Sequence, residues 1–474
     1  MVDTLITRGT VITMDPERRV IKDGAVAVEN TRILAVGKSQ ELESSYATER
    51  VIDASGKIVM PGLFDGHSHA GHGLIKSLGI HSDLWYQACE EVYARGSTEA
   101  FWEADALLTA LERLRFGVTS SITFMGGGDS VMRTDDPVYG DRHCRAVQRV
   151  GVRERLAIGP RRPPFPRTFS HWEGSIRRDR EVSFEDQLEV CEALVEVWNE
   201  GRVRVCVMSP TAHPEHGGIT GAEFEELKQQ SQVMRELSRR HGVLFTQDGH
   251  STGTVKFAHE EMGLLGEDAL FSHSTGLTDE EIDLCARTGT RIVHNPSAVA
   301  SIVARCPVPE LLDAGVTVML GSDAAAPDRS YDMFRHIFQC MRYHRRHFKD
   351  PRILPPGKVL EMATIDAAVA MGVDGELGSL EPGKVADIIL VDARRPHMYP
   401  LNMAVDRVAY FANGNDVATV LVDGEVLMED RVVKTVVEDD VLDLAQGELE
   451  AALDRNGLRH LTEYTEGYWG HSRY

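Results

Sequence analysis

Short apolar runs broken by Gly, Asp and Asn fill the first 60 residues of the chain. TLITRG, TVITMD, GAVAVENTRILAVG and RVIDASGKIVM are rich in β-branched residues and have the length of strands. Apart from a possible turn near Gln40–Ser44, no segment there has the roughly 3.6-residue period of an amphipathic helix. The pattern predicts a small β structure over residues 1–60.

Apolar, strand-like runs alternate with helical patterns over residues 61–383. One helix is predicted over Thr98–Arg115, and another begins after Ser183, whose hydroxyl can cap it. A third begins with a capping box made by Thr278 and Glu281. Roughly eight such strand-then-helix units follow one another, which is the pattern of a closed parallel barrel.

Strand-like runs return after residue 384, in ADIILVDA, VAYFANG and VATVLVDGEVL. Like the first 60 residues, they are short apolar runs broken by Gly, Asp or Asn, so both chain ends are predicted to pair in one small β-sandwich. A helical run, DDVLDLAQGELEAALDRNG, and an aromatic end complete the chain. The predicted division is an N-terminal sandwich segment (1–60), the barrel (61–383), a C-terminal sandwich segment (384–433) and a helical, aromatic tail (434–474).

The composition narrows the classes of partner and compartment. Apolar residues make up 42%, and 51 Lys+Arg against 73 Asp+Glu give a formal net charge of -22. Such an acidic chain repels phosphate backbones and anionic lipids, and no run approaches the roughly 18 apolar residues of a membrane span. The start lacks the pattern of a signal peptide, and the seven cysteines form no CxxC pair. We therefore expect a cytoplasmic protein with reduced thiols that binds neither nucleic acid nor membranes.

The first chemistry-bearing residues stand in the run PGLFDGHSHA. His67 and His69 are two positions apart, so in a strand both imidazoles point to the same side. Gly66 leaves room for close approach. The pair would end the first barrel strand, on the face where barrel enzymes form their active sites. Because imidazole is the commonest ligand of zinc-like ions, we interpret the pair as metal ligands rather than as two surface histidines.

Three further strand ends carry polar side chains. Asp323 comes after VTVML, and a carboxylate there can bind metal and accept the proton of a nucleophilic water. His273 follows ALFS, where it can bind metal or stabilise an oxyanion. His294 or Asn295, after the run RIV, can hold substrate. Each also has a structural role open to it, such as capping a helix or hydrogen bonding within the fold.

Several runs together resemble the successive motifs of the amidohydrolase superfamily: PGLFDGHSHA, FGVTS, HSTGLTDEEI, HNPSA, LLDAGVTVMLGSDAA and GSLEPGKVADIILVD. The resemblance covers nearly the whole chain and is nearest to the branch that holds cytosine, guanine and triazine deaminases. It implies an α/β fold, a (β/α)8 TIM barrel with a composite β-sandwich. It also implies one divalent metal, zinc first, with iron, cobalt or manganese as alternatives. The ligands would be His67, His69 and Asp323, with His273 as a ligand or a catalytic group.

The chain departs from that branch on the fifth barrel strand, where the usual motif is HxHxxE. In the branch, the second His binds metal and the Glu moves the proton in deamination. Here the segment is FTQDGHS, so the ligand position falls on Gln247 or Asp248 and the Glu position on His250 or Ser251. We place Gln247 in the predicted ligand set and leave Asp248 and His250 as alternatives. The carboxylic acid that would protonate a ring nitrogen is absent at that position.

This absence favours hydrolysis of an amide, urea or (thio)carbamate over deamination of a ring. The metal would polarise a carbonyl, a metal-activated water would attack, and an amine would leave. Asp323 would take the proton of the water and pass it to the amine, while His273 and His250 would hold or polarise the carbonyl. Superfamily members that split phenylurea and thiocarbamate (molinate-type) herbicides look similar in this respect.

Two other functions stay open. One is a hydrolytic deaminase of a purine, pyrimidine or triazine ring, with His250 replacing the missing Glu. The other is a catalytically inactive assembly protein. A scaffold of that kind would need none of His67, His69, His273 and Asp323.

The substrate is expected to be a small, apolar or aromatic molecule, because aromatic residues follow several predicted strands. Trp85 comes after the first strand, Phe165 after the third and His213 after the fourth. With Asn295 they form the predicted substrate contacts. A homo-oligomer is the default expectation for a soluble enzyme, and the aromatic tail could dock on another subunit.

Overall fold

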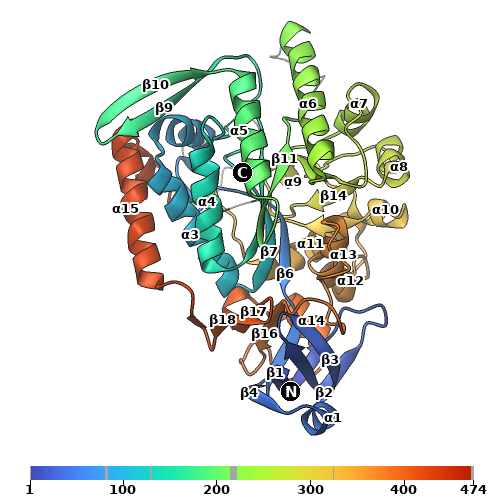
Figure 1. Cartoon of the computed structure of the whole chain (residues 1–474). Helices are drawn as coiled ribbons and strands as arrows, with labels where there is room; N and C mark the ends of the chain where they lie inside the picture. The colour runs from blue at the N-terminus through green and yellow to red at the C-terminus, as the bar shows by residue number, and fades with distance from the viewer. Residues whose placement is uncertain (1, 81–83, 129–130, 214–220, 324, 471–474) are drawn as a thin grey trace.

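An eight-stranded parallel sheet forms the centre of the molecule (Figure 1). The computed structural model describes residues 2–80, 84–128, 131–213, 221–323 and 325–470. Within them, the strands of this sheet lie in the order β15-β14-β13-β12-β11-β8-β7-β6. Their bounds are β6 (Leu63–His69), β7 (Val118–Phe124), β8 (Arg153–Ile158), β11 (Val203–Met208), β12 (Phe245–Gln247), β13 (Ala269–Ser272), β14 (Arg291–His294) and β15 (Val318–Leu320).

Helices follow the barrel strands along the chain and lie around the sheet (Figure 1). The predicted caps are present, because capping boxes begin the helices after Ser183 and Thr278. Thr98 was predicted to lie within a helix and instead caps it, accepting from the amide of Phe101. The helices of the barrel region are α2 (Trp85–Glu90), the π-helical η2 (Glu91–Gly96), α3 (Glu99–Arg115), α4 (Pro137–Val150), α5 (Phe184–Val197), α6 (Gly221–His241), α7 (Thr254–Glu260), α8 (Asp279–Thr288), α9 (Ala300–Val303), α10 (Val308–Asp313), α11 (Met333–Phe348), α12 (Pro356–Met362) and α13 (Ile365–Ala370).

The first and last barrel strands meet through hydrogen bonds at their carboxyl ends. The amide of Asp323, just after β15, donates to the carbonyl oxygen of His67 at 2.8 Å. The amide and hydroxyl of Ser322 donate to the two carboxylate oxygens of Asp65 at 2.8 and 2.7 Å. These contacts close the sheet and confirm the predicted (β/α)8 TIM barrel. They also bring residues 67 and 323, remote in the chain, to the same place.

A buried ionic network supports this closure. Arg113 of α3 donates to Glu154 of β8 at 3.3 Å, while its other terminal nitrogen donates to Ser68 and lies 3.5 Å from Asp65. His143 of α4 donates to Glu154 at 2.6 Å. Burial raises the pKa of Glu154, but His143 and Arg113 outweigh burial and lower that pKa to about 2. One guanidinium thus links two carboxylates that belong to different barrel strands, and His143 is a second partner of Glu154.

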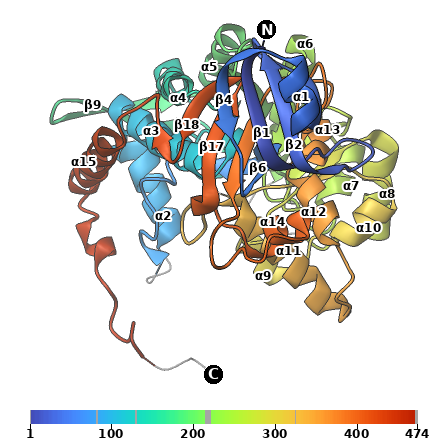
Figure 2. The same cartoon turned by 90° about the horizontal axis from the view of Figure 1, so that it is seen from below.

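A second sheet is built from both ends of the chain, and Figure 2 shows these strands side by side. The order is β19-β18-β17-β16-β5-β1-β2-β3, with β4 pairing with β1. The strands are β1 (Val2–Ile12), β2 (Val20–Glu29), β3 (Arg32–Lys38), β4 (Thr48–Asp53), β5 (Lys57–Pro61), β16 (Ile388–Asp392), β17 (Val417–Val422), β18 (Glu425–Glu429) and β19 (Val432–Val433), with helix α1 (Ser39–Ser45) after β3.

Strand β1 branches this sheet, because its first half pairs with β4 and its second half with β5. A single buried apolar cluster contains Ile6 and Val59 from the N-terminal strands together with Ile388 and Leu421 from the C-terminal strands. The two chain ends therefore share one core, as the sequence pattern predicts. The hydrogen bonds make it one continuous sheet. The exact domain boundaries stay a prediction.

Ion pairs fasten this sheet to the barrel. Arg153 of β8 donates to Asp387 at 2.8 Å and also pairs with Asp423, in the turn between β17 and β18. Arg202, just before β11, donates to Asp423 at 2.6 Å and to Glu425 at 2.9 Å. The β sheet lies at the amino-terminal end of these barrel strands, away from the strand ends that carry the predicted site.

One predicted strand is a helix instead. VAYFANG was expected to be extended, but residues 404–411 form α14 (Ala404–Phe411). The reason lies in the spacing of Val405, Val408, Ala409 and Ala412, which is the i, i+3, i+4, i+7 pattern of a helix face. Of these, Val408 and Ala409 are fully buried. The Val, Tyr and Phe residues of this short run are typical of a strand and concealed the helical period.

The Pro-rich stretch after β8 leads into a hairpin of β9 (Arg167–Glu173) and β10 (Ile176–Val182). Phe169 and Val182 are buried there against Ala94. Since alternating apolar residues are few in this hairpin, the sequence pattern provided little sign of it.

The tail contains the predicted helix, α15 (Glu438–Asn456), followed by a short 3-10 turn η4 (Arg459–Thr462). Arg455 fastens α15 to η2 by donating to the carbonyl oxygen of Gly96 at 2.7 Å. Beyond it the aromatic residues Tyr464, Tyr468 and Trp469 are exposed and contact one another. Residues 471–474 of the predicted tail lie outside the described residues. Whether the tail docks on another subunit stays a prediction.

All seven cysteines are buried free thiols. Among the described residues, none of the helices has both the length and the apolar character needed to cross a membrane.

Replacing Arg113 by Met should lower the free energy of unfolding by about 3–5 kcal/mol, because two buried carboxylates would lose their countercharge. Chemical denaturation followed by circular dichroism measures this loss. The difference from wild type should shrink as the pH falls from 4.5 towards about 2, where Glu154 becomes protonated and no longer needs the guanidinium. Arg142→Met is the control, because Arg142 pairs with Glu99 on the exposed surface. Equal losses in the two variants would contradict the account.

Candidate active site

Five side chains converge on one point at the carboxyl-terminal end of the barrel. His67 and His69 lie at the end of β6, while Asp248, His273 and Asp323 follow β12, β13 and β15. The distances from histidine Nε2 to carboxylate oxygen are 3.2 Å for His67–Asp248, 3.4 Å for His67–Asp323, 3.7 Å for His69–Asp248, 3.3 Å for His69–Asp323, 3.1 Å for His273–Asp248 and 3.6 Å for His273–Asp323. The group therefore surrounds a space of atomic size.

The orientation of His67 fits a metal ligand. Its ring is fully buried, and among the described residues neither ring nitrogen has a hydrogen-bond partner. Two carboxylate oxygens nevertheless lie within 3.4 Å of Nε2. A buried polar atom without a partner is costly, so a lone pair directed between carboxylates indicates a bound cation. The donor set of imidazole nitrogens and carboxylate oxygens suits a divalent ion of the zinc type.

His69 is held by a backbone contact. Its Nδ1 lies 2.9 Å from the carbonyl oxygen of Gly126, just after β7. The amide nitrogen of Gly128 also lies 3.2 Å from Nδ1. The carbonyl contact is the shorter of the two and a carbonyl oxygen can only accept, so Nδ1 carries the proton there and Nε2 keeps its lone pair toward the carboxylates. Such an outer hydrogen bond is the usual device that orients a metal-binding histidine.

Asp248, which the sequence left as an alternative to Gln247, lies in this group, and which of the two binds a metal stays a prediction. The amide nitrogen of Gln247 points toward the end of β11 and lies 3.1 Å from the Ser209 hydroxyl and 3.0 Å from the Pro210 carbonyl oxygen. Successive strand residues face opposite ways, so Asp248 turns to the barrel mouth. The hydroxyl of Ser272 donates to Asp248 at 3.0 Å and helps to hold it.

His273 and Asp323 both adopt left-handed backbone conformations, with φ of 62° and 58°. Such angles are rare outside glycine and concentrate at functional sites. Arg329 holds the Asp323 loop, since its Nε donates to the Asp323 carbonyl oxygen at 2.8 Å and its Nη2 lies 3.5 Å from the carboxylate. One oxygen of Asp323 thus faces the histidines while the other faces a guanidinium.

The electrostatics keep both carboxylates ionised. Burial raises the pKa of Asp248 and Asp323, but His67 and His273, together with Arg329 beside Asp323, hold both values well below the usual range. Burial lowers the pKa of His273, but Asp323 and Asp248 outweigh it and raise that pKa to about 10. The same carboxylates raise the pKa of His67 against its burial. The cluster therefore requires positive charge, either protons on the imidazoles or a cation between them.

His250 lies beside the cluster but outside it. Its Nδ1 is 2.9 Å from the Thr254 hydroxyl, and its ring stacks on Phe271 with centroids 4.0 Å apart. Burial, with a smaller effect from His213, lowers the pKa of His250 to about 3. The ring is therefore neutral, and its Nε2 has no hydrogen-bond partner among the described residues. Its predicted catalytic role stays a prediction.

The predicted substrate residues lie at different places around the barrel mouth. Both side-chain polar atoms of Asn295 are buried without a hydrogen-bond partner among the described residues. Trp85 begins α2, with its ring 6.2 Å from that of His72, which in turn is 4.9 Å from His69. Phe165 packs against Phe184 at the start of α5, with centroids 6.1 Å apart.

His213 is near enough to His250 to lower its pKa. Residues 214–220, which follow it, lie outside the described residues. For Asn295, Trp85, Phe165 and His213 alike, contact with substrate stays a prediction.

Sequence reasoning missed two residues that support the site, Ser272 and Arg329. Ser272 immediately precedes His273, so its position beside a predicted site residue was a usable signal. Arg329 follows Asp323 by six positions in an irregular loop, where no periodicity indicates the direction of a side chain.

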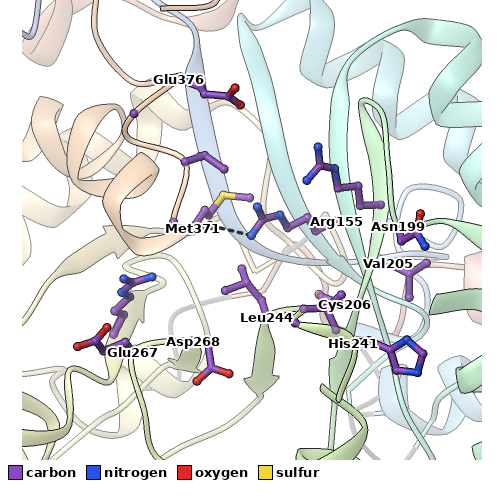
Figure 3. Close-up of a pocket in the computed structure, with 17 residues that line it drawn as sticks. Arg155, Asn199, Val205, Cys206, His241, Leu244, Glu267, Asp268, Met371 and Glu376 are labelled. Atoms are coloured by element: carbon purple, nitrogen blue, oxygen red, sulfur yellow. Dashed lines mark hydrogen bonds between the residues drawn. The ribbon is translucent and has the colours of Figure 1, made fainter. Parts of the chain in front are cut away.

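The opposite end of the barrel has a cavity of about 610 Å³ (Figure 3). Its lining includes Leu244, Asp268 and Arg291, which precede or begin β12, β13 and β14. Arg155 lines it as well and donates to the carbonyl oxygen of Met371 at 2.8 Å. Since none of the five converging residues lines this cavity, it is separate from the candidate active site.

Known proteins match this chain along most of its length. A 5-methylthioadenosine/S-adenosylhomocysteine deaminase of Syntrophobacter fumaroxidans is 31% identical over 451 residues, which are 93% of this chain and 96% of that protein. A 5'-deoxyadenosine deaminase of Methanosarcina acetivorans is 30% identical over 468 residues, with coverage of 96% and 99%.

Solved structures share the fold. An adenosine deaminase from Xanthomonas campestris with bound zinc has a TM-score of 0.80 at 23% identity, and covers 96% of this chain and 99% of its own. The atrazine chlorohydrolase TrzN from Arthrobacter aurescens, complexed with zinc, has a TM-score of 0.76 at 21% identity, with coverage of 94% and 100%. These likenesses confirm the barrel with its added β sheet.

The family assignment follows from the sequence matches. The model of the amidohydrolase family matches residues 58–427, which include all five converging side chains. The motifs predicted this superfamily, whereas the finer resemblance to phenylurea and thiocarbamate hydrolases stays a prediction. The chain belongs to the amidohydrolase family, and the relatives that match most of its length are named as deaminases.

Proposed function

We propose that the chain hydrolyses a bond between an sp² carbon and a nitrogen leaving group in a small molecule, at a single divalent-metal site. The observation that carries this proposal is the convergence of His67, His69, Asp248, His273 and Asp323 on one point at the barrel mouth. His67, His69, Asp248 and Asp323 would hold the cation. Zinc is the first candidate, in line with the zinc in the structurally similar deaminase.

A divalent cation held there would lower the pKa of a coordinated water from about 15.7 towards about 7 and polarise the carbon under attack. Asp323 is placed to take the proton of that water, because one of its oxygens faces the cluster. It can then pass the proton to the leaving nitrogen. Arg329 keeps the other oxygen occupied and so fixes the direction of the carboxylate.

His273 would act on the oxygen that gains charge at the attacked carbon. Its Nε2 faces the same point as those of His67 and His69, so it either joins the ligands or donates to that oxygen. The water oxygen ends on carbon, and the nitrogen leaves as ammonia or an amine with the transferred proton.

A heteroaromatic ring amine is the first candidate substrate, because the relatives of this chain are named as deaminases of adenine-containing molecules. These names favour the predicted alternative over the predicted main function. A ring deaminase must also protonate a ring nitrogen, and no carboxylic acid stands at position 250 or 251. Such a reaction would rely on Asp323 or on His250 for this proton.

An amide, urea or carbamate is the second candidate, and the β12 segment favours it. A carbonyl oxygen can be polarised directly, so an acyl substrate needs no second acid at the ring nitrogen. Asp248 and His250, in place of a histidine and a glutamate, are compatible with that simpler requirement.

Incubation in ¹⁸O-water should place one ¹⁸O atom on the carbon that loses nitrogen, because the attacking oxygen comes from water. The zinc-loaded chain is incubated with two panels of candidate substrates, and mass spectrometry measures the ¹⁸O content of the products. One panel is 5'-deoxyadenosine and 5-methylthioadenosine, assayed for ammonia. The other is N-aryl ureas, amides and thiocarbamates, assayed for amine. The panel that reacts selects between the two candidates.

A reaction in neither panel, by a chain that holds one metal ion, would contradict the proposal. Asp323→Asn is the matched control, because it keeps the size of the side chain but cannot accept the proton. It should turn over no substrate that the wild type uses.

Asp248→Asn should lower metal affinity and kcat/KM by at least about 100-fold, more than the loss typical of outer partners of a metal site. The charge that balances the cation would be lost while the shape remains. Metal content after dialysis and steady-state kinetics measure the two effects.

Gln247→Leu is the control for its neighbour, because the Gln247 amide contacts Ser209 and Pro210 instead. This variant should keep its metal. Normal metal content in Asp248→Asn, or metal loss in Gln247→Leu alone, would refute the proposed ligand set.

A further inference from the structure

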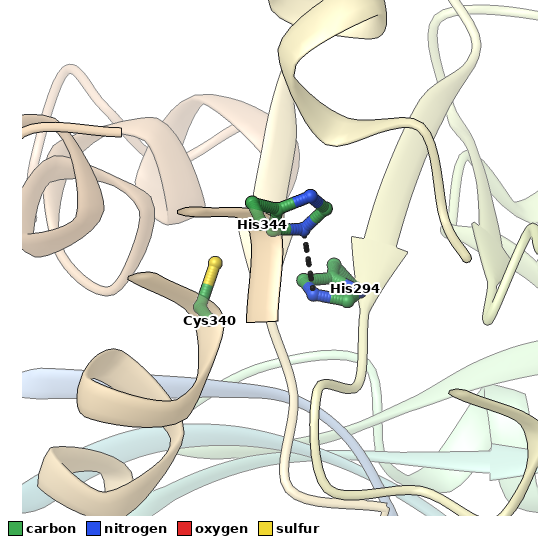
Figure 4. Close-up of side chains that lie close together, drawn as sticks. All are labelled: His294, Cys340 and His344. Carbon is green, nitrogen blue, oxygen red and sulfur yellow. Dashed lines mark hydrogen bonds between the residues drawn. The ribbon is translucent and has the colours of Figure 1, made fainter. Parts of the chain in front are cut away.

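A second cluster of metal-binding side chains lies behind the active site, between β14 and α11 (Figure 4). His294 ends β14, while Cys340 and His344 stand one turn apart on the same face of α11. One ligand atom from each residue lies within 4.8 Å of those of the other two. None of these residues belongs to the group around His67.

All three side chains are fully buried, with no exposed surface. The Nδ1 atoms of both histidines have no hydrogen-bond partner among the described residues. The contact that they do make joins His294 Nε2 to His344 Nε2 at 3.4 Å. This is longer than the roughly 2.7–3.2 Å usual for a hydrogen bond. Two buried imidazoles and a thiol are therefore poorly satisfied by one another.

The same separation suits two ligands of one ion. Zinc–nitrogen bonds of about 2.0–2.1 Å at a tetrahedral angle put two imidazole nitrogens about 3.3–3.4 Å apart. The observed 3.4 Å between the two Nε2 atoms equals that edge. Figure 4 shows the sulfur of Cys340 beside the contact between His294 and His344, so this sulfur can supply the third ligand.

We propose that His294, Cys340 and His344 hold a thiophilic metal ion, such as zinc, at a structural site distinct from the catalytic one. Burial lowers the pKa of His294 well below its ordinary value and that of His344 to about 3, which keeps both lone pairs free. Burial raises the pKa of the Cys340 thiol, so the metal must displace its proton into solvent as the sulfur–metal bond forms.

Such an ion would tie α11 to the end of β14. The first residue of α11, Met333, follows the loop that contains Asp323 and Arg329. The bound ion would therefore fix the helix that follows this loop, and the loop positions the carboxylate of Asp323. It would act on the stability of that loop rather than touch substrate.

Cobalt(II) titration of the chelator-treated full chain tests the proposal, because of the two proposed sites this one alone has a sulfur ligand. The five catalytic side chains offer nitrogen and oxygen alone, so thiolate-to-cobalt charge-transfer absorption reports Cys340 without interference. Wild type should bind about two cobalt ions per chain, in line with two separate ligand sets, and should show the band.

Cys340→Ser should bind about one ion and lose the band. Cys191→Ser is the matched control, a buried thiol on α5 that belongs to none of the possible metal-binding groups among the described residues, and should behave as wild type. One cobalt ion per wild-type chain, without the band, would overturn the proposal, and that result does not depend on any variant folding. Loss of one ion without loss of the band in Cys340→Ser would overturn it as well.

Discussion

The buried pairing of two carboxylates with three imidazoles is the constraint on which the rest of the structure depends. Asp323 is buried and the Asp248 side chain is 14% exposed, and histidine nitrogens lie 3.1–3.7 Å from their carboxylate oxygens. Two ionised carboxylates at this depth need a countercharge held in good geometry, since unpaired buried charge is costly. A single divalent cation would supply this countercharge, and the same cation would activate water.

Barrel closure places these groups. The Asp65 carboxylate binds both the amide and the hydroxyl of Ser322, and the next amide, that of Asp323, binds the His67 carbonyl oxygen. Arg113 links Asp65 and Glu154 underneath. The chemistry of the site and the stability of the barrel therefore share residues. The left-handed backbone of Asp323 is maintained because these contacts hold its strand end in place.

Much of this arrangement could be predicted from the sequence. His67, His69, His273 and Asp323 stand directly at strand ends, where period-two alternation and the rule for barrel active sites determine their direction. Asp248 could not be separated from Gln247, because β12 has three residues and one position decides which side chain faces the mouth. The prediction of a strand at VAYFANG was wrong for a related reason. Its Val, Tyr and Phe residues are typical of a strand, but the apolar residues of this segment have the spacing of a helix face.

Asp248, which follows β12, is the residue on which the proposed metal site depends most. Anomalous X-ray diffraction at the zinc edge, from crystals of the zinc-loaded chain, tests it most directly. The account predicts an ion bound by His67, His69, Asp248 and Asp323, with the Gln247 amide still on Ser209 and Pro210. An ion bound by Gln247 or His250 with Asp248 turned away, or no ion between His67 and Asp323, would contradict it.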